Sequence, residues 1–208
     1  MTRGLLITFE GIDGCGKTLQ SQLLYEWLLQ KGQAACLTCQ PGGSSLGRGL
    51  RQLLLENGQE QINDAAEVLL FAADRAQHVS EVIKPALNAG KIVICDRYID
   101  SFIAYQGGGR GISIAILEAL NDFSLQGCLP DVTFYLEISL DVAMGRWKGV
   151  DRIEQEDQDF YLRVKSAYDQ IAEQNRQRII TLEAERTPSE IFADIKAVVE
   201  EKLIKCMI

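Results

Sequence analysis

Five short apolar runs alternate along the chain with longer stretches of helical periodicity, and this alternation limits the fold more than any other feature. The apolar runs predict strands over residues 5–10, 34–39, 91–96, 132–137 and 178–182. The periodic stretches predict helices over residues 17–31, 44–56, 63–89, 98–106, 113–125, 140–147, 156–175 and 188–203. Apolar strands that are each followed by helix are typical of a parallel sheet covered on both faces. The pattern therefore predicts an α/β fold with a five-stranded parallel sheet.

The whole chain, residues 1–208, is expected to form a single domain. A chain of this length buries roughly 70% of its unfolded surface, enough for a stable core. The sequence contains no internal repeat, no low-complexity segment and no linker rich in proline, glycine or serine. Two smaller domains would need a boundary, and the sequence offers none.

The charge balance argues against several classes of partner. Lysine and arginine number 21 against 29 aspartates and glutamates, a net charge of −8. Such an acidic chain is poorly suited to non-specific binding of nucleic acid or anionic membranes. No stretch approaches the ~18 to 20 apolar residues of a membrane span, and the N-terminus lacks a signal-peptide pattern. We therefore expect a cytoplasmic protein with no nucleic-acid and no membrane partner, although a local nest of donors could still bind a small phosphorylated ligand.

Two isolated features suggest other chemistry only weakly. Cys36 and Cys39 form one CxxC motif, but a second pair and a neighbouring histidine are missing, so zinc or redox chemistry is not expected. His78 is the only histidine and falls in a polar helical stretch, where we expect no catalytic role.

A glycine-rich motif stands directly after the first predicted strand and before the first predicted helix. The sequence Gly-Ile-Asp-Gly-Cys-Gly-Lys-Thr fits the P-loop pattern, in which backbone N–H groups form an anion nest at a helix N-terminus. Lys17 is expected to reach the β- and γ-phosphates of a nucleotide, and the Thr18 hydroxyl to ligate Mg²⁺. The residues expected to bind ATP are Gly11, Ile12, Asp13, Gly14, Cys15, Gly16, Lys17 and Thr18.

Asp96 ends the third apolar run, where P-loop proteins place a second group that holds Mg²⁺ through water. The alternative is an aspartate that only caps the next helix. The chain lacks the N/T-K-x-D and D-x-x-G motifs of guanine-specific switch proteins, and motors and helicases need a longer chain. A small-molecule kinase with a P-loop NTPase fold remains.

Further motifs follow in a fixed order and spacing. They occupy residues 9–18, 41–43, 50–51, 70–75, 96–98, 100–101, 104–107 and 151–154. In these segments the chain resembles the bacterial thymidylate kinases, a family of P-loop nucleoside monophosphate kinases, over nearly its whole length. The resemblance implies transfer of the γ-phosphoryl group of ATP·Mg²⁺ to dTMP, which gives dTDP and ADP for dTTP synthesis. It also implies a homodimer.

The resemblance implies a substrate site for dTMP as well. Phe71 would stack on thymine, and Arg75 would donate to a thymine carbonyl. Arg97 would bind the acceptor phosphate through bidentate hydrogen bonds from its planar guanidinium. The alternatives are a core phenylalanine, a solvated arginine and an ordinary ion pair of Arg97. The full set of implied substrate-binding residues is Pro41, Arg51, Phe71, Arg75, Arg97, Ser101, Tyr105 and Gln106.

The resemblance also implies a short lid around residues 144–152. Arg146 would cover the transferring phosphate and neutralise charge in the transition state, with Lys148 and Arg152 beside it. A solvated basic loop is the alternative. Asp13 would face the acceptor's sugar, so the implied catalytic residues are Lys17, Arg97, Arg146 and Asp13.

Two departures from the family pattern bear on activity. Cys39-Gln40 stands before Pro41 where the family commonly has Arg-Glu, and the lid is one residue short with Lys148 in place of an arginine. Loss of the carboxylate at Gln40 weakens the case for a water and Mg²⁺ network beside the acceptor phosphate. Two alternatives therefore stay open: a kinase for another nucleoside monophosphate, and a regulator that binds ATP and dTMP without turnover. We expect the peptide bond before Pro41 to be cis, as in the family.

Overall fold

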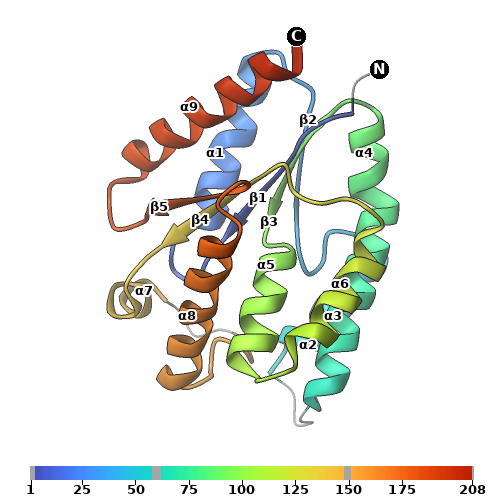
Figure 1. The fold of residues 1–208 in the computed structure, drawn as a ribbon, viewed down its shortest axis with the longest axis vertical. Coiled ribbons are helices and arrows are strands. Elements are labelled where there is room, and N and C mark those ends of the chain that lie inside the picture. The colour runs from blue at the N-terminus through green and yellow to red at the C-terminus, as the bar shows by residue number, and fades with distance from the viewer. Residues whose placement is uncertain (1–2, 58–61, 148–150, 208) are drawn as a thin grey trace.

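The computed structural model describes residues 3–57, 62–147 and 151–207, the side chains of residues 205–207 excepted. One parallel sheet with the strand order β2-β3-β1-β4-β5 forms its centre (Figure 1). The strands are β1 (Leu6–Glu10), β2 (Ala35–Cys39), β3 (Ile92–Asp96), β4 (Val132–Glu137) and β5 (Ile179–Glu183). The α/β fold with a five-stranded parallel sheet is therefore confirmed, and each strand lies within one residue of its predicted bounds.

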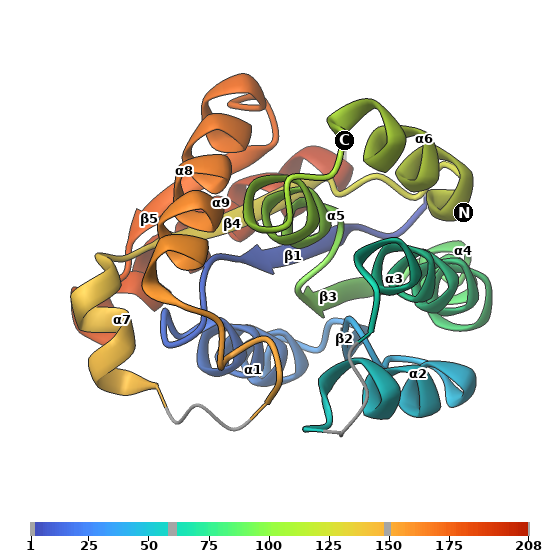
Figure 2. The same ribbon diagram turned by 90° about the horizontal axis from the view of Figure 1, so that it is seen from below.

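Helices cover both faces of the sheet, with α5 and α8 on one face and α1 on the other (Figure 2). Helix α9 lies beside α1 (Figure 1). The helices are α1 (Lys17–Gln30), α2 (Ser45–Leu55), α3 (Asp64–His78), α4 (Lys84–Asn88), α5 (Ile99–Phe102), α6 (Ile114–Leu125), α7 (Leu140–Arg146), α8 (Gln158–Gln174) and α9 (Pro188–Met207). Among the described helices, none is long and apolar enough to span a bilayer.

Side chains of the central strands alternate between two buried clusters, as the pleat of a strand requires. Ile7 and Phe9 of β1 belong to the cluster that includes Leu24 and Leu28 of α1. Leu6, whose side chain points to the opposite face of the sheet, belongs to the second cluster. Complete burial of such a side chain stabilises the fold by about 1.5–3 kcal/mol, and Leu6, Ile7 and Phe9 contribute in this way on the two faces of the strand.

Two predicted helices contain π-helical turns. The stretch predicted over residues 63–89 is helical throughout, but α3 passes into a π-helical segment, η1 (Val79–Ile83), before α4. Pro85 stands in the first turn of α4, and since proline has no N–H and its ring crowds the preceding turn, a regular α-helix cannot run through it. A second π-helical segment, η2 (Ile103–Gly109), extends α5 by three residues beyond the predicted end at residue 106.

The carboxyl ends of three neighbouring strands meet at one edge of the sheet. Phe9 of β1 pairs with Asp96 of β3, and Cys39 of β2 pairs with the same Asp96. The segments that follow these strands therefore start side by side. They are the glycine-rich loop, the Gln40–Pro41 turn and the turn at Arg97, and binding sites of parallel α/β sheets lie at this edge.

Candidate active site

The loop between β1 and α1 has the backbone that a phosphate-binding nest requires. Gly11, Gly14 and Gly16 have φ angles of 135°, 80° and 100°. A Cβ atom on Gly14 would lie 2.5 Å from the carbonyl oxygen of Ala143, so glycine is also required there for space. The Lys17 Nζ atom folds back over the loop and donates to the carbonyl oxygens of Gly11 and Ile12, at 3.0 and 2.8 Å.

The two residues predicted to hold a metal ion lie in contact. The Thr18 hydroxyl donates to Oδ2 of Asp96 across 2.6 Å, although the residues are 78 positions apart. Hydroxyl and carboxylate oxygens are the ligands that Mg²⁺ prefers, and the pair lies beside the Lys17 loop. These residues therefore fit the ion that the sequence predicts.

Arg97 follows β3 in a left-handed backbone conformation, with a φ of 66°. Its Nη1 group donates to Gly11 O and Ser101 Oγ at 3.0 and 3.2 Å, and its Nη2 group donates to Asp13 and to the Tyr105 hydroxyl. Burial by itself would lower the pKa of Arg97, but Asp13 and the neighbouring Tyr105, Tyr168 and Asp96 together outweigh this effect and raise it. Burial would raise the pKa of Asp13, yet Arg97 and Lys17 hold it below its usual value.

Glu10, the last residue of β1, is a buried carboxylate that the sequence reasoning missed. It accepts hydrogen bonds from the Tyr98 backbone N–H at 2.7 Å, from Ser101 Oγ and from the Tyr168 hydroxyl at 3.2 Å. Burial, together with the nearby charge of Asp100, raises its pKa to about 7. The available signal was an acid at the end of an otherwise apolar strand.

Arg75 of α3 is buried and lines the same cleft as Lys17 and Arg97. Its Nε group donates to Oε1 of Gln40 at 3.0 Å, its Nη1 group donates to Oδ1 of Asn121, and its guanidinium lies 4.5 Å from the centre of the Phe102 ring. Burial lowers the pKa of Arg75 to about 10. Asn121 was also missed, because one polar residue on an apolar helix face gives little signal.

The predicted cis peptide bond between Gln40 and Pro41 is confirmed. Arg51 of α2 donates to the Pro41 carbonyl oxygen at 2.8 Å, and so holds the turn that carries Gln40. Both residues border the same cleft as Arg75.

A second buried carboxylate, Glu67 of α3, joins Arg152 at the end of the predicted lid to Gln106 and Arg110. It accepts hydrogen bonds from Gln106 at 3.2 Å, from Arg110 at 3.2 Å and from Arg152. Arg152 also donates to Leu54 O at 3.1 Å. Burial would raise the pKa of Glu67, but the two arginines hold it below its usual value. Arg152 is thus fixed to α2 and α3.

Arg146, the last residue of α7, lies at the rim of the cleft. Its side chain is exposed and donates to the Ala184 carbonyl oxygen at 3.2 Å, close to the end of β5. This is not the orientation of a residue that covers the transferring phosphate, so that role stays a prediction. Residues 148–150 of the predicted lid, with Lys148, lie outside the described residues.

A cleft of about 940 Å³ brings most of these groups together. Its volume is at the upper end of the range for small-molecule sites. The predicted residues that line it are Asp13, Gly14, Gly16, Lys17, Thr18, Pro41, Arg51, Phe71, Arg75, Asp96, Arg97, Ser101, Tyr105, Gln106 and Arg146. The side chains of Ile12 and Cys15 belong to the core instead, so these residues and Gly11 can serve a nucleotide only through the backbone of the loop.

Comparison with known proteins gives a consistent result. A sequence model of the thymidylate kinase family matches residues 9–195. The thymidylate kinase of Halothermothrix orenii is 46% identical, over 98% of this chain and 100% of its own. That of Nostoc sp. (strain PCC 7120) is 42% identical, over 96% and 97%. A crystal structure of thymidylate kinase from Ehrlichia chaffeensis has a TM-score of 0.80 and 35% identity, and the match covers 95% of this chain and 99% of that one. A family match over most of the chain, joined to a P-loop and an arginine-rich cleft at the expected positions, leads to one conclusion: this chain belongs to the thymidylate kinase family.

Proposed function

We propose that this protein transfers the γ-phosphoryl group of ATP to dTMP, giving dTDP and ADP, with the cleft as its active site. Family membership gives the reaction, the phosphorylation of dTMP to dTDP. The observation that supports the site is the position of Arg97, which contacts the phosphate-binding loop at Gly11 and Asp13 and the acceptor side at Ser101. A single cation there can hold an acceptor phosphate against the end of a donor triphosphate.

The donor side of the proposal consists of the loop backbone, Lys17, Thr18 and Asp96. Loop N–H groups cradle the phosphates, and Lys17 turns from the carbonyl oxygens of its own loop to the β- and γ-phosphates. Thr18 and Asp96 would hold Mg²⁺. When bound, the ion supplies positive charge to the β- and γ-oxygens.

On the acceptor side, Arg97 holds the phosphate of dTMP and Asp13 faces the sugar. Phe71, half-buried at the cleft, stacks on thymine, and Arg75 donates to a thymine carbonyl. The guanidinium of Arg75 is held by Gln40 and Asn121 at Nε and Nη1, which leaves its Nη2 edge for the base. Tyr105 and Gln106 complete the sugar and base contacts, and Pro41 and Arg51 line the same cleft.

The transfer step follows from positions and charges. An oxygen of the dTMP phosphate attacks the γ-phosphorus, a new P–O bond forms, and the bond from the γ-phosphorus to the bridging oxygen of ADP breaks. The attacking phosphate is already anionic, so the step needs no strong general base. Lys17 neutralises the charge that spreads over the moving group, together with Arg146 once its side chain turns from the Ala184 carbonyl oxygen into the cleft.

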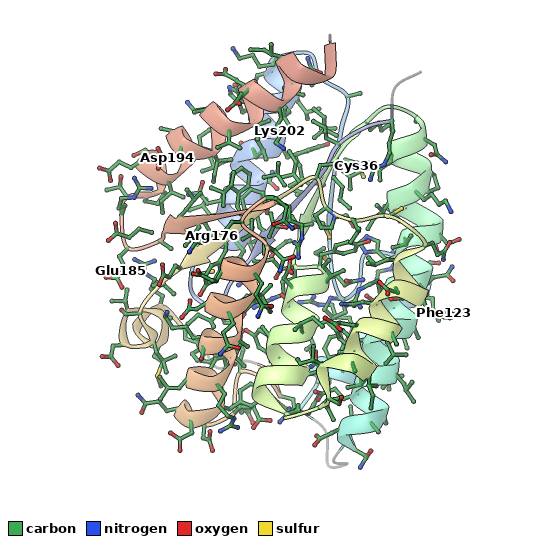
Figure 3. All side chains as sticks on the ribbon, in the orientation of Figure 1. Cys36, Phe123, Arg176, Glu185, Asp194 and Lys202 are labelled. Atoms are coloured by element: carbon green, nitrogen blue, oxygen red, sulfur yellow. The ribbon has the colours of Figure 1, made fainter. Side chains whose placement is uncertain are left out.

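We propose that the protein is a homodimer through α2, α3 and α6. These helices run along one side of the molecule (Figure 2). They expose Leu53, Leu69, Ile116 and Phe123 by 63%, 58%, 54% and 82%, and Phe123 projects outward from α6 (Figure 3). Large exposed apolar residues on adjoining helices are typical of a protein interface. A solution mass of one chain would contradict the dimer. A cytoplasmic location stays a prediction from the sequence.

ADP release from ATP·Mg²⁺, with dTMP, dUMP, dCMP, AMP and GMP offered separately, tests the proposed function. We expect turnover to be strongest with dTMP. Faster turnover with another monophosphate would make the protein a kinase of that nucleotide. Binding of dTMP without ADP release would make it a regulator, and both results would contradict the proposal.

A further inference from the structure

The backbone of Arg97 needs support from its surroundings. A φ of 66° is unfavourable for a residue with a Cβ atom, and such a conformation persists only when neighbouring contacts fix it. Asp13, Gly11 and Tyr105 hold the far end of the side chain, the guanidinium. A different group holds the turn itself.

That group is Glu10, which is 0% exposed and lies within hydrogen-bond distance of the turn. One carboxylate oxygen accepts the N–H of Tyr98, the residue that follows Arg97, at 2.7 Å. The other oxygen accepts from Ser101 Oγ and from the Tyr168 hydroxyl. Ser101 and Tyr168 also lie 3.2 and 3.5 Å from Nη1 of Arg97, so Glu10 supports both the backbone and the side chain of this arginine.

A carboxylate suits the hydrogen-bonding groups of this cluster. The groups that converge on Glu10 are one N–H and two hydroxyls, and an ionised carboxylate is a pure acceptor with lone pairs for all of them. A glutamine would present its NH₂ group to one of these donors. Burial raises the pKa of Glu10 to about 7, so the fold keeps an acid where its charge is unfavourable.

We propose that Glu10 is a positioning residue for phosphoryl transfer, which aims Arg97 at the acceptor phosphate through Tyr98, Ser101 and Tyr168. Glu10 lies outside the described lining of the cleft and so acts on the substrate only through these neighbours. The inference rests on the proposed function, in which Arg97 grips the phosphate of dTMP.

The proposal is tested by the affinity for dTMP relative to thymidine, the same nucleoside without its phosphate. Titration calorimetry gives both dissociation constants. Their ratio measures how much the phosphate of dTMP contributes to binding, separately from recognition of the base. We expect the wild-type chain to favour dTMP strongly. In Glu10→Gln this preference falls about tenfold or more while thymidine affinity is unchanged, because one hydrogen bond to a charged group is lost and Arg97 shifts.

A double-mutant cycle shows whether the effect passes through Arg97. Arg97→Ala removes the preference for dTMP, and we expect Glu10→Gln to add no further loss in that background. The matched control is Asp131→Asn, which removes a carboxylate that accepts the N–H of Leu6 at 2.7 Å, at the opposite end of β1. This control keeps the wild-type ratio.

Three results would overturn the inference: a wild-type ratio in Glu10→Gln, an equal loss of thymidine and dTMP affinity, or an additive loss in the double variant. If Glu10→Gln does not fold, Tyr168→Phe removes one hydroxyl of the cluster, and an unchanged ratio there has the same meaning. A wild-type chain that does not distinguish dTMP from thymidine would contradict the proposed function itself, and the inference with it.

Discussion

The Nη2 group of Arg97 donates a hydrogen bond to the Oδ1 atom of Asp13, and this bond joins the turn after β3 to the phosphate-binding loop. The two segments are adjacent because Phe9 and Asp96 pair in neighbouring parallel strands. The salt bridge places a fixed positive charge beside the loop that would hold the donor phosphates. In the proposed function Arg97 would therefore border both the donor and the acceptor site, and its displacement is expected to affect both.

Arg97→Ala is expected to reduce kcat/KM for dTMP about a thousandfold, since it removes a charged donor that acts on the reacting phosphate. Phe71→Ala removes only stacking on the base, for which about 10–100-fold is expected. Steady-state kinetics with dTMP varied at saturating ATP provide the comparison. Comparable losses in the two variants would contradict the role given to Arg97.

Gln40→Ala is expected to raise KM for dTMP about 10–100-fold, because Nε of the buried Arg75 loses its acceptor. Gln40→Glu keeps an oxygen in that place and should remain close to the wild type. Kinetics of both variants, with KM for ATP as the internal control, test this prediction. It is wrong if Gln40→Glu loses as much as Gln40→Ala.

Asp96→Asn is expected to raise the Mg²⁺ concentration for half-maximal rate about 10–100-fold, as is typical when a partner around a metal ion is removed. Removal of divalent cations with EDTA should abolish turnover in every variant, and added Mg²⁺ should restore it. Titration of Mg²⁺ at fixed ATP provides the measurement, with Asp131→Asn as the control. An unchanged Mg²⁺ dependence would remove Asp96 from the metal site.

His78 should remain neutral in the folded protein at pH values where an exposed histidine gains a proton. Its imidazole is buried, with Nε2 at 2.7 Å from Thr38 Oγ1, and burial and the charge of Arg75 lower its pKa to about 4. The unfolded chain takes up this proton near pH 6.5, so His78 makes stability fall as the pH drops from 6.5 to 4. Since the chain has one histidine, proton NMR of a tag-free protein isolates its ring signals. Titration near pH 6.5 in the folded protein would contradict this.

The sequence predicted the sheet well, because apolar runs and the glycine-rich motif are local signals. β4 matches the predicted strand at both ends, and the Thr18–Asp96 pair follows from two motifs whose positions in a P-loop fold are fixed. The π-helical turns of η1 and η2 were not predicted. A π-helical turn replaces i→i+4 by i→i+5 backbone bonding over only a few residues, and so short a change gives little signal in the sequence.

The buried residues that hold the site residues in place were harder to predict than the site residues themselves. Glu10, Glu67 and Asn121 are buried polar residues whose side-chain partners lie between 39 and 158 positions away, from Gln106 for Glu67 to Tyr168 for Glu10. A single sequence shows such residues only as interruptions of an apolar pattern. The direction of Arg146 could not be predicted either, because an exposed arginine has many rotamers and its contact with Ala184 depends on where β5 ends.

The most direct test of the central claim, that one cleft holds both nucleotides end to end, uses adenosine and thymidine joined through their 5′ oxygens by five phosphates. Calorimetry and inhibition kinetics measure its stoichiometry and its competition with each substrate. We expect one molecule per chain, bound more tightly than either substrate and competitive with both ATP and dTMP. Competition with ATP alone, or two independent molecules per chain, would contradict it.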